Sequence, residues 1–247
     1  MEASSNEGLP RPRPSDFCSI ITRRADLVRR STLFSEISPK DCAGIVACAS
    51  ERHFQRGKAI FLQGDPVRQV ILLTSGCIKL SQMSPGGQEV ILRLIGPGEP
   101  VSAESCTKCQ DHCSTARALE RSSVLAWESK TFEAFVERFP ILLRNVWSDL
   151  QRHMTQLEER YREISTQKVA PRLSSQLVRL LTTVGKPSNG HVEIALSQRD
   201  LAQLTGTTLF TVSRLLSQWQ AQGIVIPRRQ GLLIVNAPAL EHLSQNG

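Results

Sequence analysis

The chain has 247 residues, of which 40% are hydrophobic and 21% are charged, and its formal net charge is +7. This length and composition allow one large or two ordinary packed domains. No apolar run approaches the roughly 20 residues that a bilayer-spanning helix needs, which excludes a helical membrane protein.

The positive charge favours an anionic partner only weakly, because many basic proteins merely have solvated surfaces. Residues 1–26 are polar and proline-rich, and they lack the apolar stretch of a signal peptide. We therefore expect a disordered tail over 1–26 and a cytoplasmic protein. Thiols stay reduced in that compartment, so clustered cysteines indicate a metal or redox site more than a structural disulfide.

Short β-branched or alternating runs, separated by glycine turns, extend from Phe54 to Leu125. Turn signals stand at Gly64 and Gly76. Several short strands at this spacing predict an antiparallel sandwich or barrel. Together with the helical residues before them, they define a predicted N-terminal β-barrel domain over 27–138.

A long helix is predicted after Pro140, a residue that suits the first turn of a helix. Apolar residues then recur at alternating spacings of four and three, which is a heptad pattern. A helix packed on its own barrel would also carry an apolar stripe, but a strict 3.5-residue period favours a seam between two helices of a homodimer. The predicted dimerisation helix and hinge span 139–167, with Pro171 as a breaker or a new start. The predicted seam contains Leu143, Trp147, Leu150, Met154, Leu157, Tyr161 and Ile164.

The C-terminal segment carries the pattern of a helix-turn-helix. Ser197 can cap one helix, and Thr207 or Thr208 can cap the next. Ala202 is small where two helices would cross, and Gly206 follows four residues on, where the turn needs a positive φ. The run IVIPRRQGLLIV then predicts a two-stranded wing.

This predicted winged helix-turn-helix domain spans 168–247 and indicates double-stranded DNA as a partner. From Val169 onward, seven Lys or Arg residues outnumber three acids. The second helix is expected to enter the major groove, with Arg214 giving a bidentate bond to guanine and Phe210 contacting a thymine methyl. The predicted DNA-contacting residues are Ser197, Gln198, Thr207, Thr208, Phe210, Thr211, Ser213, Arg214, Arg228 and Arg229.

A glycine-rich β-barrel, a long dimer helix and a C-terminal winged helix-turn-helix, in that order, resemble the Crp–Fnr family of bacterial transcription regulators. The segments that carry the resemblance are GKAIFLQGDP, LLTSGCIKL, GPGEP and, most specifically, LSQRDLAQLTGTTLFTVSRLL. The resemblance implies an α+β fold, a homodimer on a two-fold-symmetric operator, contact with RNA polymerase and no enzymatic activity. The family's usual base readers are a glutamate, then a serine or glycine and an arginine. Ser213 and Arg214 match the last two, whereas Phe210 takes the place of the glutamate.

Cyclic-nucleotide members of the family bind phosphate in the loop after GPGE, with a Gly–Glu pair at its start and an Arg–Ser pair at its end. Here the loop begins PVSAES and ends at Ser114–Thr115, with no arginine at the charge-bearing position. A bound phosphate would lack its counter-charge, so no cyclic nucleotide is expected. The loop nevertheless occupies the family's effector position.

Three of the seven cysteines lie in this loop as C-x2-C-x3-C, at Cys106, Cys109 and Cys113. Thiolates at these spacings can converge on one centre, and both iron–sulfur clusters and zinc bind about four ligands. The fourth ligand could be Cys18 in the tail or Cys77 on the barrel, and zinc could accept His112. We therefore expect an iron–sulfur cluster of the 4Fe–4S type that senses oxygen, nitric oxide or redox state.

Zinc, a metal-free thiol–disulfide switch and unconnected surface cysteines are the alternatives. The family's iron–sulfur branch uses several tail cysteines and one in the strand before the dimer helix. Here only Cys18 lies in the tail and Ala126 occupies the strand position, so that ligand set cannot be carried over. A metal-thiolate electron carrier or enzyme is the competing class, but no paired-carboxylate, Ser–His–Asp or P-loop arrangement is recognisable.

Cys42 and Cys48 lie six residues apart on a predicted helix. We interpret both as buried small hydrophobic residues rather than ligands, because free cysteine is among the most buried residue types.

Overall fold

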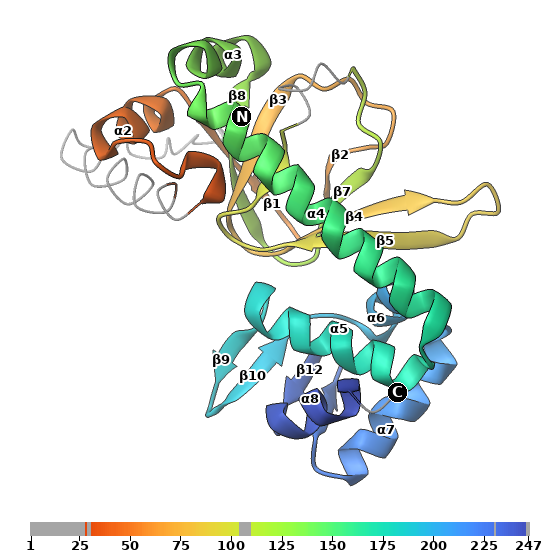
Figure 1. The fold of residues 1–247 in the computed structure, drawn as a ribbon. Helices are drawn as coiled ribbons and strands as arrows, with labels where there is room; N and C mark the ends of the chain where they lie inside the picture. The colour runs from red at the N-terminus through yellow and green to blue at the C-terminus, as the bar shows by residue number, and fades with distance from the viewer. Residues whose placement is uncertain (1–27, 29–30, 104–109, 230, 246–247) are drawn as a thin grey trace, which may run out of the picture.

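The computed structural model of this chain describes residues 28, 31–103, 110–229 and 231–245. An N-terminal half made mainly of strands and a smaller C-terminal half are joined by the long helix α4, which runs diagonally across Figure 1. The predicted disordered tail over 1–26 lies outside the described residues. None of the helices in the described ranges combines the length and the apolar character that crossing a bilayer requires.

The elements follow the predicted order of strands, long helix and C-terminal helices. The N-terminal half contains η1 (Thr32–Phe34), α2 (Pro39–Ala47), β1 (Ser50–Phe54), β2 (Ala59–Phe61), β3 (Gln69–Ser75), β4 (Ile78–Met83), β5 (Glu89–Ile95), β6 (Pro100–Ser102), β7 (Thr115–Ala118), β8 (Ser122–Glu128) and α3 (Ser129–Arg138). The rest of the chain forms α4 (Ile141–Thr166), α5 (Val169–Thr183), β9 (Lys186–Ser188), β10 (His191–Ile194), α6 (Gln198–Thr205), α7 (Leu209–Ala221), β11 (Val225–Arg228), β12 (Gly231–Ile234) and α8 (Ala237–Gln245).

The strands of the N-terminal half form two antiparallel four-stranded sheets, in the orders β1-β8-β3-β6 and β2-β7-β4-β5. The predicted α+β class and the antiparallel strands are confirmed, but the described strands form two separate sheets rather than one closed barrel. Gly76 makes the turn between β3 and β4 at φ 94°. A Cβ at this position would lie 2.6 Å from the backbone oxygen of Arg121, so the turn accepts only glycine.

The first of these sheets is covered on both faces, which explains its nearly continuous apolar strands. Along β3, Leu73 packs into the cluster shared with the second sheet, whereas Leu72 packs with the helices. Trp127 on β8 is buried on the helix side, and its Nε1 donates a hydrogen bond to the Ile45 carbonyl of α2 at 2.8 Å. Its ring lies beside Phe34, with ring centroids 5.7 Å apart.

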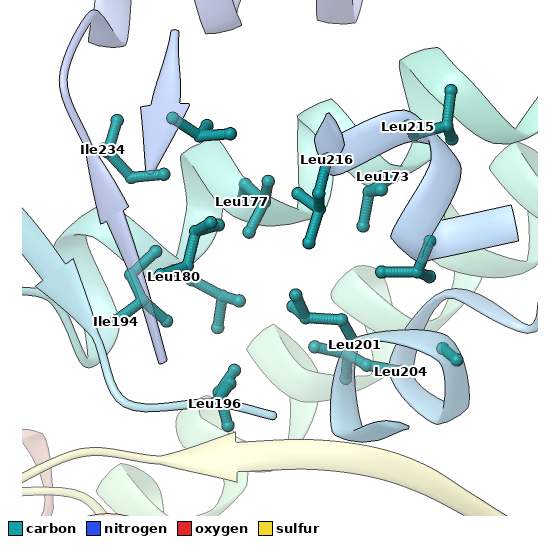
Figure 2. Close-up of a cluster of buried hydrophobic side chains, with 14 of the residues drawn as sticks. Leu173, Leu177, Leu180, Ile194, Leu196, Leu201, Leu204, Leu215, Leu216 and Ile234 are labelled. Atoms are coloured by element: carbon teal, nitrogen blue, oxygen red, sulfur yellow. The ribbon is translucent and has the colours of Figure 1, made fainter. Parts of the chain in front are cut away.

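The C-terminal half packs its helices on a sheet of order β11-β12-β10-β9. Leu177 and Leu180 of α5 point into the same core as Leu201 and Leu204 of α6, as Figure 2 shows. Pro171 lies in the first turn of α5, where its missing N–H removes no helical hydrogen bond.

The two halves share one hydrophobic core. Cys77, Ile91 and Leu94 of the N-terminal half belong to the same buried cluster as Leu180 and Leu201 of the C-terminal half. Helix α6 therefore rests directly on β5, and its position depends on residues from both halves.

Candidate nucleic-acid interface and cysteine loop

Helix α6 begins with a capping box, as the sequence predicts for Ser197. The Ser197 hydroxyl accepts a hydrogen bond from the Asp200 backbone N–H at 3.1 Å, and the Asp200 carboxylate accepts one from the Ser197 N–H at 3.2 Å. Two amides that lack helical partners at the start of α6 are thereby satisfied. Ser197 thus has a structural role, while its contact with DNA stays a prediction.

The turn between α6 and α7 depends on a glycine and a threonine. Gly206 adopts the left-handed conformation at φ 61°, and its N–H donates to the Ala202 carbonyl. The Thr208 hydroxyl accepts a hydrogen bond from the Thr211 N–H at 3.1 Å, so Thr208 rather than Thr207 caps α7. The positive φ, the cap and the buried small residue Ala202 confirm the predicted helix-turn-helix.

The start of α7 presents an apolar and basic face to solvent. Phe210 is 78% exposed, and Arg214 is exposed one turn later, where an i,i+4 spacing places both on one face of the helix. Within the described part of the chain, Arg214 makes no ion pair. A major groove offers partners for both side chains, since thymine carries a methyl group and guanine carries two acceptors.

The wing carries exposed positive charge at its tip. Strands β11 and β12 form a hairpin whose last pair joins Arg228 to Gly231. Arg228 and Arg229 are both exposed. Cations on an exposed hairpin beside a recognition helix can contact the phosphate backbone, which fixes the register of the protein on the duplex.

All ten predicted DNA-contacting residues are at least partly accessible. The more exposed members are Thr208, Phe210, Arg214, Arg228 and Arg229. The half-buried members are Ser197, Gln198, Thr207, Thr211 and Ser213.

Sequence reasoning missed Leu209, which is 47% exposed beside Phe210. Its spacing of three from the buried Val212 and seven from the buried Leu216 assigns it to the core stripe of α7. Leu209 is the first residue of α7, however, and the buried residues of this helix begin only at Val212. Only its position at the end of the helix could have revealed its exposure.

Comparisons with known proteins agree with this architecture. Residues 51–139 match the cyclic nucleotide-binding domain family, and residues 171–243 match the Crp-like helix-turn-helix domain family. Together the two matches cover more than half of the chain. The chain belongs to the Crp–Fnr family of transcription regulators.

Similar proteins support the same assignment. The chain is 28% identical to the cyclic AMP receptor protein of Thermus thermophilus, over 80% of this chain and 89% of that protein. It is 23% identical to the nitrogen fixation regulation protein FixK of Bradyrhizobium diazoefficiens, over 88% and 91% of the two chains. The structure of FixK2 from Bradyrhizobium japonicum has the same fold, with a TM-score of 0.70 at 22% identity over 79% of this chain and 96% of that one. The chain is thus a DNA-binding regulator rather than an enzyme.

Helix α4 of this Crp–Fnr regulator buries a face that includes polar residues as well as Leu142 and Val146, and it exposes most of its apolar stripe. Asn145 is buried, and its Nδ2 donates hydrogen bonds to the carbonyls of Leu33 at 3.1 Å and Ser35 at 2.8 Å. Asp149 and Glu163 are buried as well. The alternative in which the apolar stripe packs on its own barrel is therefore wrong. Except for the half-buried Leu143, the stripe is exposed: Trp147 57%, Leu150 40%, Met154 57%, Leu157 49%, Tyr161 74% and Ile164 46%.

The described part of the cysteine loop contains Cys113, whereas Cys106, Cys109 and the proposed fourth ligand Cys18 lie outside the described residues. Cys113 is exposed just before β7, and its carbonyl accepts a hydrogen bond from Gln82 at 2.7 Å. Within the described ranges, no three His, Cys, Asp or Glu side chains come together as metal ligands.

The other predicted loop ligand, His112, is buried. Its ring stacks on Phe61 with centroids 3.6 Å apart and an interplanar angle of 7°. His112 therefore contributes to the packing of the segment that ends the loop. Its role as a zinc ligand stays a prediction.

Cys77, the other proposed fourth ligand, is buried in the core, and its role as a ligand stays a prediction. Its carbonyl accepts a hydrogen bond from the Leu119 N–H at 2.9 Å, at the end of β7 opposite to Cys113. The four-residue strand β7 lies between Cys113 and Leu119, which amounts to roughly 13 Å of extended chain. Burial, followed by the charge of Glu120, also raises the pKa of Cys77 to about 12, which disfavours the thiolate that a metal requires.

The two cysteines of α2 have different environments. Cys42 is fully buried, as predicted. The prediction for Cys48 is wrong, because this residue is exposed at the C-terminal cap of α2, one residue beyond the end of the helix.

Proposed function

We propose that the chain acts as a homodimer that reads a two-fold-symmetric DNA site. The observation that carries this proposal is the exposed apolar stripe of α4, which extends from Trp147 to Ile164 while Asn145, Asp149 and Glu163 of the same helix are buried. A stripe with a 3.5-residue period is stabilised when the same stripe of a second helix covers it. Two copies related by a two-fold axis at this helix seam would present two α7 helices to half-sites about 34–36 Å apart.

In this proposal each α7 reads bases and each wing holds the backbone. Arg214 forms the bidentate contact with guanine, and Phe210 contacts a thymine methyl. Arg228 and Arg229 contact phosphates, which strengthens binding without specifying sequence. RNA polymerase is the further partner that a bound transcription regulator implies.

Binding selection with randomised duplexes tests the dimer and its DNA site. We expect the wild-type protein to enrich an inverted repeat, and analytical ultracentrifugation to show a dimer at micromolar concentration. Enrichment of a single unrepeated half-site by a monomer would refute the proposal.

We also propose that the cysteine loop reads the signal through an iron–sulfur cluster held by Cys106, Cys109 and Cys113, with Cys18 as the fourth ligand. The exposed thiol of Cys113 and the spacing of the three loop cysteines support this site. Cys42 and Cys77 are buried, whereas Cys113 is exposed, which favours Cys18 over Cys77 in this proposal. When bound, such a cluster would supply reactivity toward oxygen or nitric oxide.

Anaerobic purification followed by iron, sulfide and zinc analysis tests the cluster. We expect a brown protein with a broad absorption band near roughly 400 nm and about four iron and four sulfide per chain. Zinc without sulfide would favour the zinc-binding regulator. A metal-free protein whose DNA affinity changes on oxidation would favour the thiol–disulfide switch.

A further inference from the structure

A polar cluster lies between the N-terminal half and the first helix of the DNA-binding pair. Lys79 on β4 lies 3.0 Å from the Glu89 carboxylate on β5 and 3.4 Å from the Asp200 carboxylate on α6. The Gln203 side chain of α6 donates to Glu89 at 3.1 Å, and the Ser81 hydroxyl of β4 donates to the other Glu89 oxygen at 2.8 Å. We call these five residues the β4–β5–α6 cluster.

The cluster is partly shielded from water and remains charged, with the Glu89 side chain 25% exposed. The Lys79 side chain is 9% exposed and that of Asp200 13%. Burial alone would raise the pKa of Glu89, but the hydrogen bonds from Ser81, Lys79 and Gln203, together with the Lys79 charge, hold that pKa below its ordinary value. Glu89 is therefore a carboxylate at neutral pH.

Buried ion pairs are weak evidence for stability, because the loss of hydration offsets their attraction. Their best-attested use is to specify one arrangement among several. Apolar side chains already stabilise the contact between the two halves, since Ile91 and Leu94 share a buried cluster with Leu201. The β4–β5–α6 cluster adds directed bonds, which fix how α6 is seated on the sheet.

The cluster includes Asp200, which caps the first turn of α6 together with Ser197. One carboxylate oxygen of Asp200 accepts the hydrogen bond from the Ser197 N–H in the capping box, and the other faces Lys79. Helices α6 and α7 are in turn packed together through the buried residues Ala202 and Val212. The direction in which Phe210 projects therefore depends on how α6 is positioned on the sheet.

A second set of bonds ties the same helix to α4. Arg160 on α4 donates hydrogen bonds to the carbonyls of Ile91 on β5, at 3.1 Å, and Leu204 on α6, at 2.7 Å. Burial, followed by the charge of Arg179, lowers the pKa of Arg160 from its ordinary value. Arg160 therefore connects α4 with both β5 and α6.

We propose that Lys79 and Glu89 are positioning residues for DNA recognition, which hold Asp200 and Gln203 so that α7 keeps one fixed angle to α4. In a dimer, this angle sets the distance between the two α7 helices and hence the half-site spacing that the protein prefers. The inference rests on the proposed homodimer and adds the sensor-side residues that set its geometry.

Full-length variants test this role on duplexes that carry either one half-site or two half-sites with spacers varied in single base pairs. Lys79→Met removes the central charge, and Gln203→Ala removes one hydrogen bond from a half-buried residue without disturbing the capping box. Glu36→Gln is the matched control, because it breaks an exposed ion pair with Arg144 far from α6.

We expect each variant to bind the single half-site within about two-fold of wild type, since the α7 surface is intact. The ratio of the affinity for the best-spaced palindrome to the affinity for the single half-site should fall at least about ten-fold in Lys79→Met and about three-fold in Gln203→Ala. Affinity should also depend less sharply on the spacer length in both variants. Hydrogen exchange of the amides 201–205 should be faster in both variants, whereas Glu36→Gln should match wild type.

The outcomes separate the two proposals. A wild-type protein that does not prefer a palindrome over a half-site would refute the homodimer. A wild-type protein that does prefer it, with the same spacing profile in Lys79→Met and Gln203→Ala, would refute the positioning role alone. Loss of half-site binding in folded Gln203→Ala would also refute that role, because the cluster would then act on α7 itself.

Discussion

Ile164, the last residue of the apolar stripe on α4, lies against Gly206 in the helix-turn-helix turn. A Cβ added at Gly206 would lie 3.6 Å from Cδ1 of Ile164, which is ordinary van der Waals contact. Arg172 on α5 bridges the same two residues by donating to the Ile164 carbonyl at 3.3 Å and to the Gly206 carbonyl at 3.4 Å. The proposed dimer seam therefore touches the turn that sets the direction of α7.

Replacement of Gly206 by alanine should destabilise the protein by about 1 kcal/mol, because its φ of 61° is unfavourable for a residue with a Cβ. There is room for the added atom, so the cost is conformational. Gly44→Ala is the matched substitution inside α2 and should stabilise by about 0.5–1 kcal/mol. Urea unfolding measures both, and equal midpoints for the two variants would contradict this account.

Leu150→Lys should convert the protein from dimer to monomer. The substitution places an unpaired charge in the proposed seam, at a cost of about 3–5 kcal/mol, which weakens association by more than about 100-fold. Gln151→Lys changes the neighbouring exposed residue of α4 and should leave the dimer intact. Sedimentation at micromolar concentration checks both variants. A Leu150→Lys dimer would show that the stripe has another partner.

Arg214→Ala should relax specificity at one guanine in each half-site, with a loss of roughly 1–3 kcal/mol. A contact with phosphate alone would instead weaken binding to every sequence alike. Phe210→Glu should shift the preferred half-site toward a cytosine at a neighbouring pair, because a carboxylate accepts from the cytosine amino group. Binding selection decides between the two roles. An unchanged sequence logo for Arg214→Ala, with uniformly lower affinity, would refute base reading.

Cys106→Ser, Cys109→Ser and Cys113→Ser should each abolish metal retention, because each removes one of the proposed thiolate ligands. Cys42→Ser is the control, since Cys42 on α2 is fully buried in the core. Iron and sulfide analysis after anaerobic purification measures the effect. Full metal content in the Cys109 variant would exclude the loop as the site.

Cys77 and Cys48 should differ sharply in their reactivity toward iodoacetamide. Burial, followed by the charge of Glu120, raises the pKa of Cys77 to about 12, so its thiol stays protonated at pH 8. Cys48 is exposed and should be alkylated. Because the thiolate is the nucleophile, Cys77 should react only after unfolding, when its pKa returns toward 9.0. Mass spectrometry of the labelled peptides checks this, and equal labelling rates in the folded protein would contradict it.

The features that could be predicted from the sequence are those that neighbouring residues decide. The Ser197 cap, the positive φ at Gly206 and the phase of the stripe on α4 follow from backbone sterics and from the 3.6-residue turn, and the structure shows all three. The exposure of the stripe excludes its packing on the barrel, because no part of the described chain covers most of it, whereas the homodimer seam stays a proposal.

What only the tertiary structure decided depends on strand register and on contacts between distant segments. Register places Cys77 at the opposite end of β7 from Cys113 and divides the strands into two sheets. Lys79 meets Asp200 although 121 residues separate them in the chain. Periodicity assigns a residue to a face of its own helix or strand, but not to the partner that covers this face. Packing between the two halves selects this partner. The selected arrangement is the one that buries the most apolar area while keeping buried charges paired.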